Sequence, residues 1–279
     1  VIDDGERLVG VISLRDLVTT PPDTALKAIM IRSPHTVRPE TDQEEVARIV
    51  SQYNYLAVPV IDQDGQLLGI VTVDEIVDVI REEATEDFLQ MAGAGKDREI
   101  LMKSSWDNAR SRLPWLFASW VGGICAAAVI GIFDNTLQGT LALAAFIPVV
   151  IGMGGNIGTQ TSTLVVRGLA TGRVNVGNNI NIIFKEIRVG MILGILYGLL
   201  LGLFAIMRFV DISPYLGLVV GLGIASSMLI ATAFGSLAPL LLHRMDIDPA
   251  IATGPFVTTS IDILGVALYL GIAKIFLPV

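Results

Sequence analysis

The chain has little of the chemistry on which many enzymes depend. It contains one cysteine, Cys125, and two histidines, His35 and His243, among 279 residues. A single cysteine excludes an intrachain disulfide, which fits a soluble part exposed to the cytoplasm. We interpret Cys125 as a packing residue. Two histidines without an H-E-x-x-H pattern exclude the zinc site of an intramembrane metalloprotease, and we expect the chain not to be an enzyme.

Charge is also scarce, and it is unevenly distributed. Charged residues make up 16% of the chain and hydrophobic residues 52%, with a mean hydropathy of +0.66. Up to Arg112 the chain carries 21 of its 27 acidic and 12 of its 19 basic residues. Such a composition is typical of a membrane protein. The distribution predicts an acidic soluble part followed by a membrane part.

The soluble part contains an internal repeat. Residues 1–18, VIDDGERLVGVISLRDLV, match residues 60–77, VIDQDGQLLGIVTVDEIV, at an offset of 59. Each copy reads as strand, turn, strand and helix, with Asp-Gly turn signals at 4–5 and 64–65. Helices are expected to begin near Asp16 and Asp74.

The segment between the copies predicts a short strand and a helix. The strand covers Thr36 to Arg38, and the helix runs from about Thr41 to Tyr53. Thr41 and Glu44 have the spacing of a capping box, in which each side chain bonds a free backbone N–H of the first turn. We therefore expect this helix to begin with Thr41 as its cap.

The repeat resembles the cystathionine-β-synthase (CBS) domain, whose strand, turn and Gly-apolar-apolar-Thr pattern is present at Leu56 to Thr72. The second copy covers residues 28–87, and residues 1–27 supply the C-terminal part of a first domain. We expect its front half to precede Val1. This α+β region would bind ATP if the resemblance extends to the nucleotide element Ser/Thr-x-x-Asp, which Ser13 and Asp16 fit and Thr72 with Glu75 does not. Helix capping is the alternative for both pairs.

An acidic helix is predicted next, at residues 74–87. Glu75, Asp78, Glu82 and Glu86 share one face, and Glu83 and Asp87 lie beside it. Like charges at this spacing repel. The face is either solvated or a site for a divalent cation, which several carboxylate oxygens can hold. We expect a helical linker at residues 88–112, leading to the membrane part.

Five apolar stretches are long enough to span a bilayer, and the first four of them carry no charge. They are Leu113–Phe133, a stretch from about Thr140 to Val166, Val189–Met207, one within Ile212–Leu242, and Ala250–Leu277. More Lys and Arg residues lie inside if the soluble part is cytoplasmic. We therefore expect a multi-pass protein of the cell (inner) membrane with cytoplasmic CBS domains and an outer C-terminus. The membrane domain is residues 113–279.

The second span is unusually polar and rich in glycine. It contains Gly154, Gly155, Asn156 and Gln160 within the segment PVVIGMGGNIGTQTSTLVVRG. Such a segment suits a helix that lines a water-filled cavity. Close packing of small residues is the alternative. In the third span, glycines repeat every four residues from Gly190 to Gly202, which predicts close helix packing.

The fifth span carries a lone acid, Asp262. A carboxylate near the centre of a bilayer costs about 2.5–3.5 kcal/mol on insertion scales, so it usually has a function. Helical spacing puts small and polar residues in one stripe with Asp262, which reads as a pore wall. The stripe consists of Gly254, Thr258, Asp262, Gly265 and Tyr269. A protonated Asp262, hydrogen-bonded inside a helix bundle, is the alternative.

The motifs PVVIGMGGNIGTQ and DPAIATGPFVTTSIDILG, downstream of CBS repeats and the ATED helix, resemble the MgtE family of magnesium channels or transporters. The resemblance implies a homodimer of five-helix subunits with a pore lined by the second and fifth helices. It implies that Asp262 binds hydrated Mg²⁺, with Thr258 and Gly254 lining the pore towards the cytoplasm. It further implies a sensor of cytosolic Mg²⁺ formed by acidic residues, to which Glu75, Asp78, Glu83, Glu86 and Asp87 correspond.

We therefore predict an α-helical integral membrane protein that takes up Mg²⁺ and is gated by cytosolic Mg²⁺. A proton- or sodium-coupled divalent cation transporter is the main alternative, and a nonconducting membrane sensor is another. We expect a second copy of the chain, the lipid bilayer and divalent cations as partners, and no nucleic acid.

Overall fold

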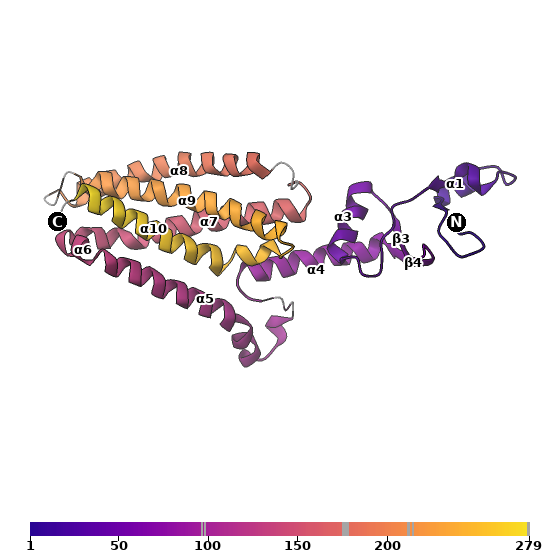
Figure 1. Cartoon of the computed structure of the whole chain (residues 1–279), viewed down its shortest axis with the longest axis horizontal. Helices are drawn as coiled ribbons and strands as arrows, with labels where there is room; N and C mark the ends of the chain where they lie inside the picture. Colours follow the sequence, from indigo (N-terminus) through magenta and orange to yellow (C-terminus); the bar gives the residue numbers. More distant parts are fainter. Residues whose placement is uncertain (96, 98, 175–178, 211–212, 214, 278–279) are drawn as a thin grey trace. The chain divides into compact units, whose positions relative to one another are not determined.

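The computed structural model describes residues 1–95, 97, 99–174, 179–210, 213 and 215–277, and it divides into two compact units, Val1–Thr85 and Glu86–Val279. The first unit has α+β structure. Its elements are β1 (Gly10–Val11), α1 (Leu14–Thr19), α2 (Leu26–Ile29), β2 (Ile31–Arg32), α3 (Gln43–Tyr53), β3 (Ala57–Ile61) and β4 (Leu67–Thr72). The helix α4 (Val73–Met91) follows β4 directly (Figure 1).

The core of the first unit lies between α3, α4 and the β3–β4 hairpin. Strand β3 pairs with β4 in antiparallel register, with Ala57 opposite Thr72. Val58, Val50 and Ile76 contribute one buried side chain each from β3, α3 and α4. The predicted strand at 36–38 is a single parallel bridge from Val37 to Val60. The helices expected near Asp16 and Asp74 are present as α1 and α4.

The two repeat copies use the same turn chemistry. Asp3 accepts hydrogen bonds from the backbone N–H groups two and four residues on, and Asp62 does the same. The left-handed position falls on Glu6 (φ 61°) in the first copy and on Gly65 (φ 82°) in the second. In the first copy the left-handed residue is therefore Glu6, one position after the glycine of the predicted Asp4-Gly5 turn.

Helix α3 begins later than the capping-box pattern indicated. Its cap is Asp42, whose Oδ1 accepts the N–H of Glu44 at 2.9 Å. Thr41 instead accepts the N–H of Arg38 in the preceding turn. The prediction of Thr41 as the cap was wrong, because both residues can cap and the turn already occupies the Thr41 hydroxyl.

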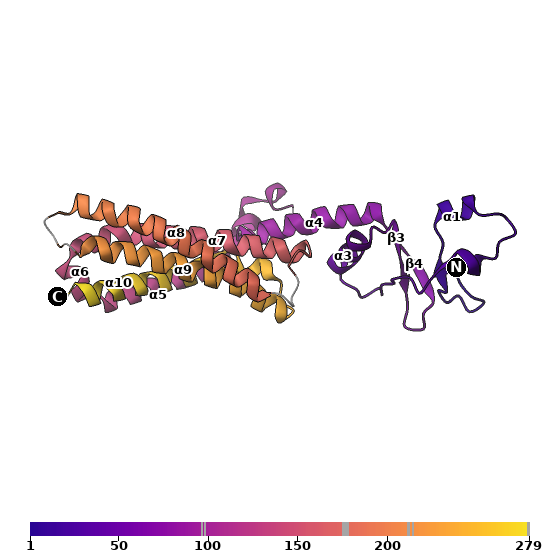
Figure 2. The ribbon, with the colours of Figure 1, turned by 90° about the horizontal axis from the view of Figure 1, so that it is seen from above.

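Five of the described helices are long and apolar enough to cross a membrane, which confirms the predicted fold class. In Figures 1 and 2, α7 to α10 run side by side. Helix α5 contacts α10. The elements of this unit are α5 (Ser105–Ile132), α6 (Asp134–Gly139), the 3-10 helix η2 (Leu141–Phe146), α7 (Ile147–Ala170), α8 (Asn179–Arg208), α9 (Leu216–Arg244), the 3-10 helix η4 (Pro249–Ala252) and α10 (Pro255–Phe276).

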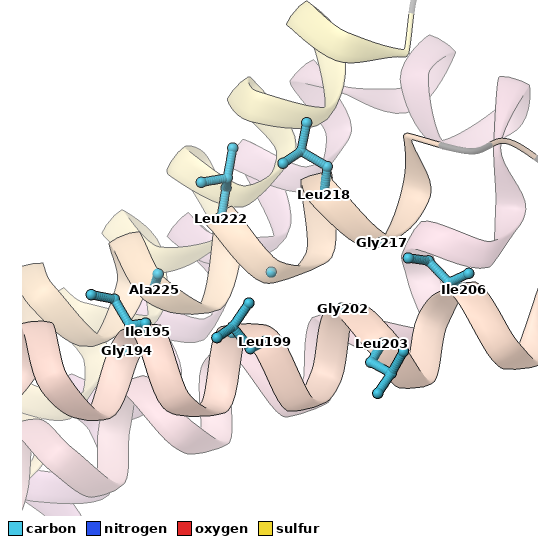
Figure 3. Close-up of a pocket in the computed structure, with 12 residues that line it drawn as sticks. Gly194, Ile195, Leu199, Gly202, Leu203, Ile206, Gly217, Leu218, Leu222 and Ala225 are labelled. Carbon is cyan, nitrogen blue, oxygen red and sulfur yellow. The ribbon is translucent and has the colours of Figure 1, made fainter.

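Helices α8 and α9 approach each other through the glycine ridge predicted in the third span. A Cβ atom added to Gly198 would lie 2.6 Å from the carbonyl oxygen of Gly221, and one added to Gly202 would lie 2.6 Å from that of Gly217. Beside this contact the two helices form a groove of about 480 Å³ (Figure 3), lined by apolar side chains and glycines. The glycine ridge is therefore a packing device, as expected.

The stretch 88–112 does not form the single linker helix that we predicted. Residues up to Met91 belong to α4, a short 3-10 helix η1 covers Ile100–Met102, and α5 begins at Ser105. Gly93 (φ 69°) and Gly95 (φ 89°) follow the end of α4 and adopt left-handed backbone angles, which cannot continue a right-handed helix. The Ser104 side chain caps α5 by accepting the N–H of Asp107.

Candidate functional site

Asp262 lies in the first half of α10, and its side chain is half-buried within the chain. A Cβ atom added to Gly155 of α7 would lie 3.7 Å from Asp262 Oδ1, which is an ordinary contact distance. Because glycine has no side chain, the space beside the carboxylate stays open on this side. The structure thus brings the acid of the fifth span against the glycine-rich segment of the second.

The neighbouring residue Ile261 explains this arrangement. Ile261 is 1% exposed, and it packs against α7 at Gly154 and Gly158. A Cβ atom at Gly154 would lie 3.1 Å from Ile261 Cγ2, and one at Gly158 would collide with Ile261 Cδ1. The two glycines form a notch that holds Ile261. The next residue, Asp262, is therefore held beside Gly155.

Two amide side chains of α7 are exposed in the single chain. Asn156 and Gln160 lie one helical turn apart and are both exposed. An amide exposed to hydrocarbon would lack hydrogen-bond partners, so these side chains need water or another protein surface. The single chain therefore presents a polar face on α7, next to Asp262.

The C-terminal part of the stripe on α10 is not a pore wall. Tyr269 is 0% exposed, its hydroxyl donates to the carbonyl oxygen of Leu143 at 3.0 Å, and its ring fills the space at Gly223 of α9. A Cβ at Gly265 would lie 2.6 Å from Ser227 Oγ. The expectation was wrong for Gly265 and Tyr269, because small and polar residues also serve to pack α10 against α9 and η2.

Gly254 and Thr258 lie at the start of α10. Gly254 is buried and precedes the first helical residue, and a Cβ atom added to it would lie 3.4 Å from the carbonyl oxygen of Met91 and 3.5 Å from that of Gln90. Thr258 is half-buried, and its hydroxyl donates to the carbonyl oxygen of Pro255 at 3.3 Å. Gly254 thus faces the end of α4. A pore-lining role for both residues stays a prediction.

The five acids expected to sense Mg²⁺ lie on the single helix α4 in different environments. Glu75 accepts the N–H of Thr72 at 2.9 Å and so caps the helix, whereas Asp78 is exposed. Glu83 accepts a hydrogen bond from Gln43 of α3. Glu86 and Asp87 are half-buried. Among the described residues, no group of three acidic, histidine or cysteine side chains converges to hold a metal.

A contact that sequence reasoning missed joins the end of α4 to the segment before α10. Gln90 is 1% exposed, and its Nε2 donates to Asp248 Oδ2 at 2.7 Å and to Glu86 Oε1 at 3.4 Å. Asp248 in turn caps η4 by accepting the N–H of Ala250. The two partners are 158 residues apart. A lone glutamine at the end of an acidic helix gives no sequence signal for such a contact.

Ser13 and Asp16 form the N-terminal cap of α1. Ser13 Oγ accepts the N–H of Asp16 at 3.1 Å and donates to Asp16 Oδ2 at 2.6 Å. Each side chain thus satisfies the other and the first helical turn. Capping accounts for this pair, and nucleotide binding there stays a prediction.

Five helices that are long and apolar enough to cross a membrane, a carboxylate where two of them meet and an α+β region ahead of them are the features of a multi-span membrane protein. Residues 147–272 match the family model of MgtE, described as a divalent cation transporter, and residues 26–82 match that of the CBS domain. In these residues the chain is similar to the MgtE family.

The relatives are named as magnesium transporters. The chain is 38% identical over 277 residues to the magnesium transporter MgtE of Bacillus subtilis (strain 168) and 37% identical over 280 residues to that of Thermus thermophilus. Each alignment covers 99% of this chain and 61% of the relative, so the chain spans about three-fifths of their length. These names describe transport rather than catalysis.

One similar solved structure is the cytosolic domain of the Mg²⁺ channel MgtE in complex with ATP. It is 49% identical, with a TM-score of 0.28, and the match covers 28% of this chain and 32% of that chain.

Proposed function

We propose that this chain conducts Mg²⁺ across the cell membrane through a pathway formed by α7 and α10. The observation that carries the proposal is the half-exposed Asp262 beside Gly155 in two membrane-spanning helices. Asn156 and Gln160 supply exposed neutral polar groups, one helical turn apart on α7. Gly154 receives Ile261 and so holds the two helices in register.

The physical chemistry of Mg²⁺ fits one carboxylate per chain. Mg²⁺ loses its water reluctantly, keeps several waters when bound, and is usually held by one or two carboxylates. Two copies of the chain on a twofold axis would present two Asp262 carboxylates to one hydrated ion. The dimer would also cover the polar face of α7, which hydrocarbon cannot solvate. Thr258 and Gly254 would follow Asp262 towards the cytoplasmic end.

For regulation, we propose that cytosolic Mg²⁺ binds the acids of α4 and closes the pathway. Glu75, Asp78, Glu83, Glu86 and Asp87 are the ligands and screening partners in this proposal. The bond from Gln90 to Asp248 supports it, because it ties the end of α4 to the segment before α10. When Mg²⁺ is scarce, repulsion among the acids would move α4 and, through this contact, the start of α10.

ATP binding at the CBS region is a further part of the proposal. The candidate residues are Ser13 and Asp16, whose hydrogen bond to each other a nucleotide would have to replace. Titration calorimetry with ATP, on the wild type and on Asp16→Ala, tests this. Equal heats from both proteins would remove these residues as the site.

The transport proposal is tested by Mg²⁺ flux into liposomes that contain the purified chain and a Mg²⁺ indicator. Asp262→Ala should abolish selective Mg²⁺ uptake, while Leu222→Ala, on the apolar α8–α9 groove, should leave it unchanged. Normal uptake by Asp262→Ala would remove the central claim. Uptake that requires an imposed proton or sodium gradient would instead favour a coupled transporter.

The regulatory proposal has its own test in the same liposomes. Asp78→Asn and Glu86→Gln should keep flux high when millimolar Mg²⁺ is present on the side of the CBS domains, where the wild type closes. Asp23→Asn is the matched control, because it removes the same charge from an exposed loop. Unchanged inhibition in the α4 variants would contradict the sensor.

A further inference from the structure

A second carboxylate, in the same compact unit as Asp262, is more buried than Asp262. Glu186 of α8 is 8% exposed, and its Oε2 accepts a hydrogen bond from Thr161 Oγ1 of α7 at 3.2 Å. Thr161 is itself 2% exposed and directly follows Gln160. A polar group buried in a membrane protein is costly unless its hydrogen bonds are made. The pathway proposed above gives Glu186 no task.

The next residue of α7 makes a similar bond in another direction. Ser162 Oγ donates to Thr253 Oγ1 at 3.2 Å, and both side chains are 0% exposed. Thr253 immediately precedes Gly254, from which α10 starts. Two consecutive hydroxyls of α7 are thus bonded to two elements: Thr161 to α8 and Ser162 to the segment that begins α10.

These bonds define how α7 is rotated about its axis. Successive residues of an α-helix are separated by about 100°, so Gln160, Thr161 and Ser162 point in three directions. When Thr161 and Ser162 are fixed in the interior, Gln160 and, one turn earlier, Asn156 have to face outwards. If α7 turned about its axis, both bonds would break in an interior where water cannot replace them. The two bonds therefore favour one orientation of α7.

We propose that Glu186 is a positioning residue of the ion pathway. Through Thr161 it holds Asn156 and Gln160 towards the path of the ion, and through the adjacent Ser162–Thr253 bond α7 and the start of α10 are held together. Glu186 acts through the acceptor oxygen of its side chain, not by placing its charge near the ion. The inference rests on the proposed function, because it assigns these residues a role in that pathway.

The acceptor role separates two substitutions of similar size. Glu186→Gln keeps a carbonyl oxygen that can accept from Thr161, so Mg²⁺ flux should stay within about twofold of the wild type. Glu186→Leu removes the acceptor and should lower flux by at least about tenfold. Thr161→Val should lower it similarly, and Thr161→Ser should restore it because the hydroxyl returns. The double variant Glu186→Leu/Thr161→Val should be no worse than either single one.

A second readout reports the rotation of α7 directly. With Cys125 replaced by serine, Asn156→Cys should react with a charged thiol reagent, and Glu186→Leu or Thr161→Val should slow this reaction by at least about tenfold. Elution and melting in detergent confirm that each variant folds, and Thr161→Val replaces Glu186→Leu if the latter does not. The proposal would be overturned if Glu186→Gln were as inactive as Glu186→Leu. It would also be overturned if Glu186→Leu left both the flux and the labelling unchanged.

The two readouts also separate this proposal from the transport proposal. A wild type without Mg²⁺ flux would contradict the proposed function, while the labelling of Asn156→Cys would still test the rotation of α7. Flux in the wild type with unaltered labelling in Thr161→Val and Glu186→Leu would contradict only the role of Glu186.

Discussion

The α7–α10 contact and the α8–α9 contact use the same packing device and present different surfaces. At both, glycines let two membrane helices approach closely: Gly158 receives Ile261, and Gly198 meets the backbone of Gly221. The α8–α9 groove is apolar, as its sticks in Figure 3 show, and suits hydrocarbon. The α7–α10 face carries Asp262 and exposed amides. Glycine therefore marks close packing, and exposed polar groups beside it mark the candidate pathway.

The largest effect should follow from filling the space beside Asp262. Gly155→Leu places an apolar side chain against the carboxylate, and a barrier higher by about 1.4 kcal/mol lowers the Mg²⁺ flux about tenfold. Gly155→Ala is the matched control, since its Cβ would lie at an ordinary 3.7 Å from Asp262 Oδ1. Liposome flux measures both. Equal flux from Gly155→Leu and the wild type would show that the ion does not pass this point.

A substitution in the α8–α9 contact should affect stability rather than transport. Gly198→Ala places a methyl group 2.6 Å from the Gly221 carbonyl oxygen, so the helices have to separate. We expect a loss of about 1–3 kcal/mol in the free energy of unfolding, measured by denaturation in detergent. Gly123→Ala, where an added Cβ meets nothing within 4 Å, is the control. Lost flux per folded molecule without lost stability would contradict the distinction between the two contacts.

A smaller effect is expected in the C-terminal part of α10. Tyr269→Phe removes the hydroxyl that donates to Leu143 and leaves this buried carbonyl oxygen without that donor. The free energy of unfolding should fall by about 1 kcal/mol, and the selectivity between Mg²⁺ and Ca²⁺ should not change. A change in selectivity at constant stability would return Tyr269 to the pore wall.

The sequence was informative wherever one residue or one composition determines the structure. Long apolar stretches predicted the five spans because a bilayer demands length and apolarity. Asp262 was found because a lone acid stands out in such a stretch. The alternation and turn residues of the repeat predicted the β3–β4 hairpin, since turn chemistry is local.

The sequence could not separate outcomes that depend on the partner of a residue. Helical spacing put Tyr269 and Asp262 in one stripe, but only packing against α9 distinguishes the buried Tyr269 from the half-buried Asp262. The helix predicted at 88–112 is interrupted after Met91, where Gly93 and Gly95 adopt left-handed angles. The Gln90–Asp248 and Thr161–Glu186 bonds join distant segments, and neither leaves a pattern in the chain.

The most direct test of the account compares water access at one position on each face. With Cys125 replaced by serine, Asn156→Cys and Leu222→Cys are exposed to a charged, membrane-impermeant thiol reagent in intact membranes. The account predicts that position 156 reacts and is protected by Mg²⁺, while position 222, which hydrocarbon covers, does not react. A cysteine at position 156 as unreactive as that at 222 would contradict a water-filled path between α7 and α10.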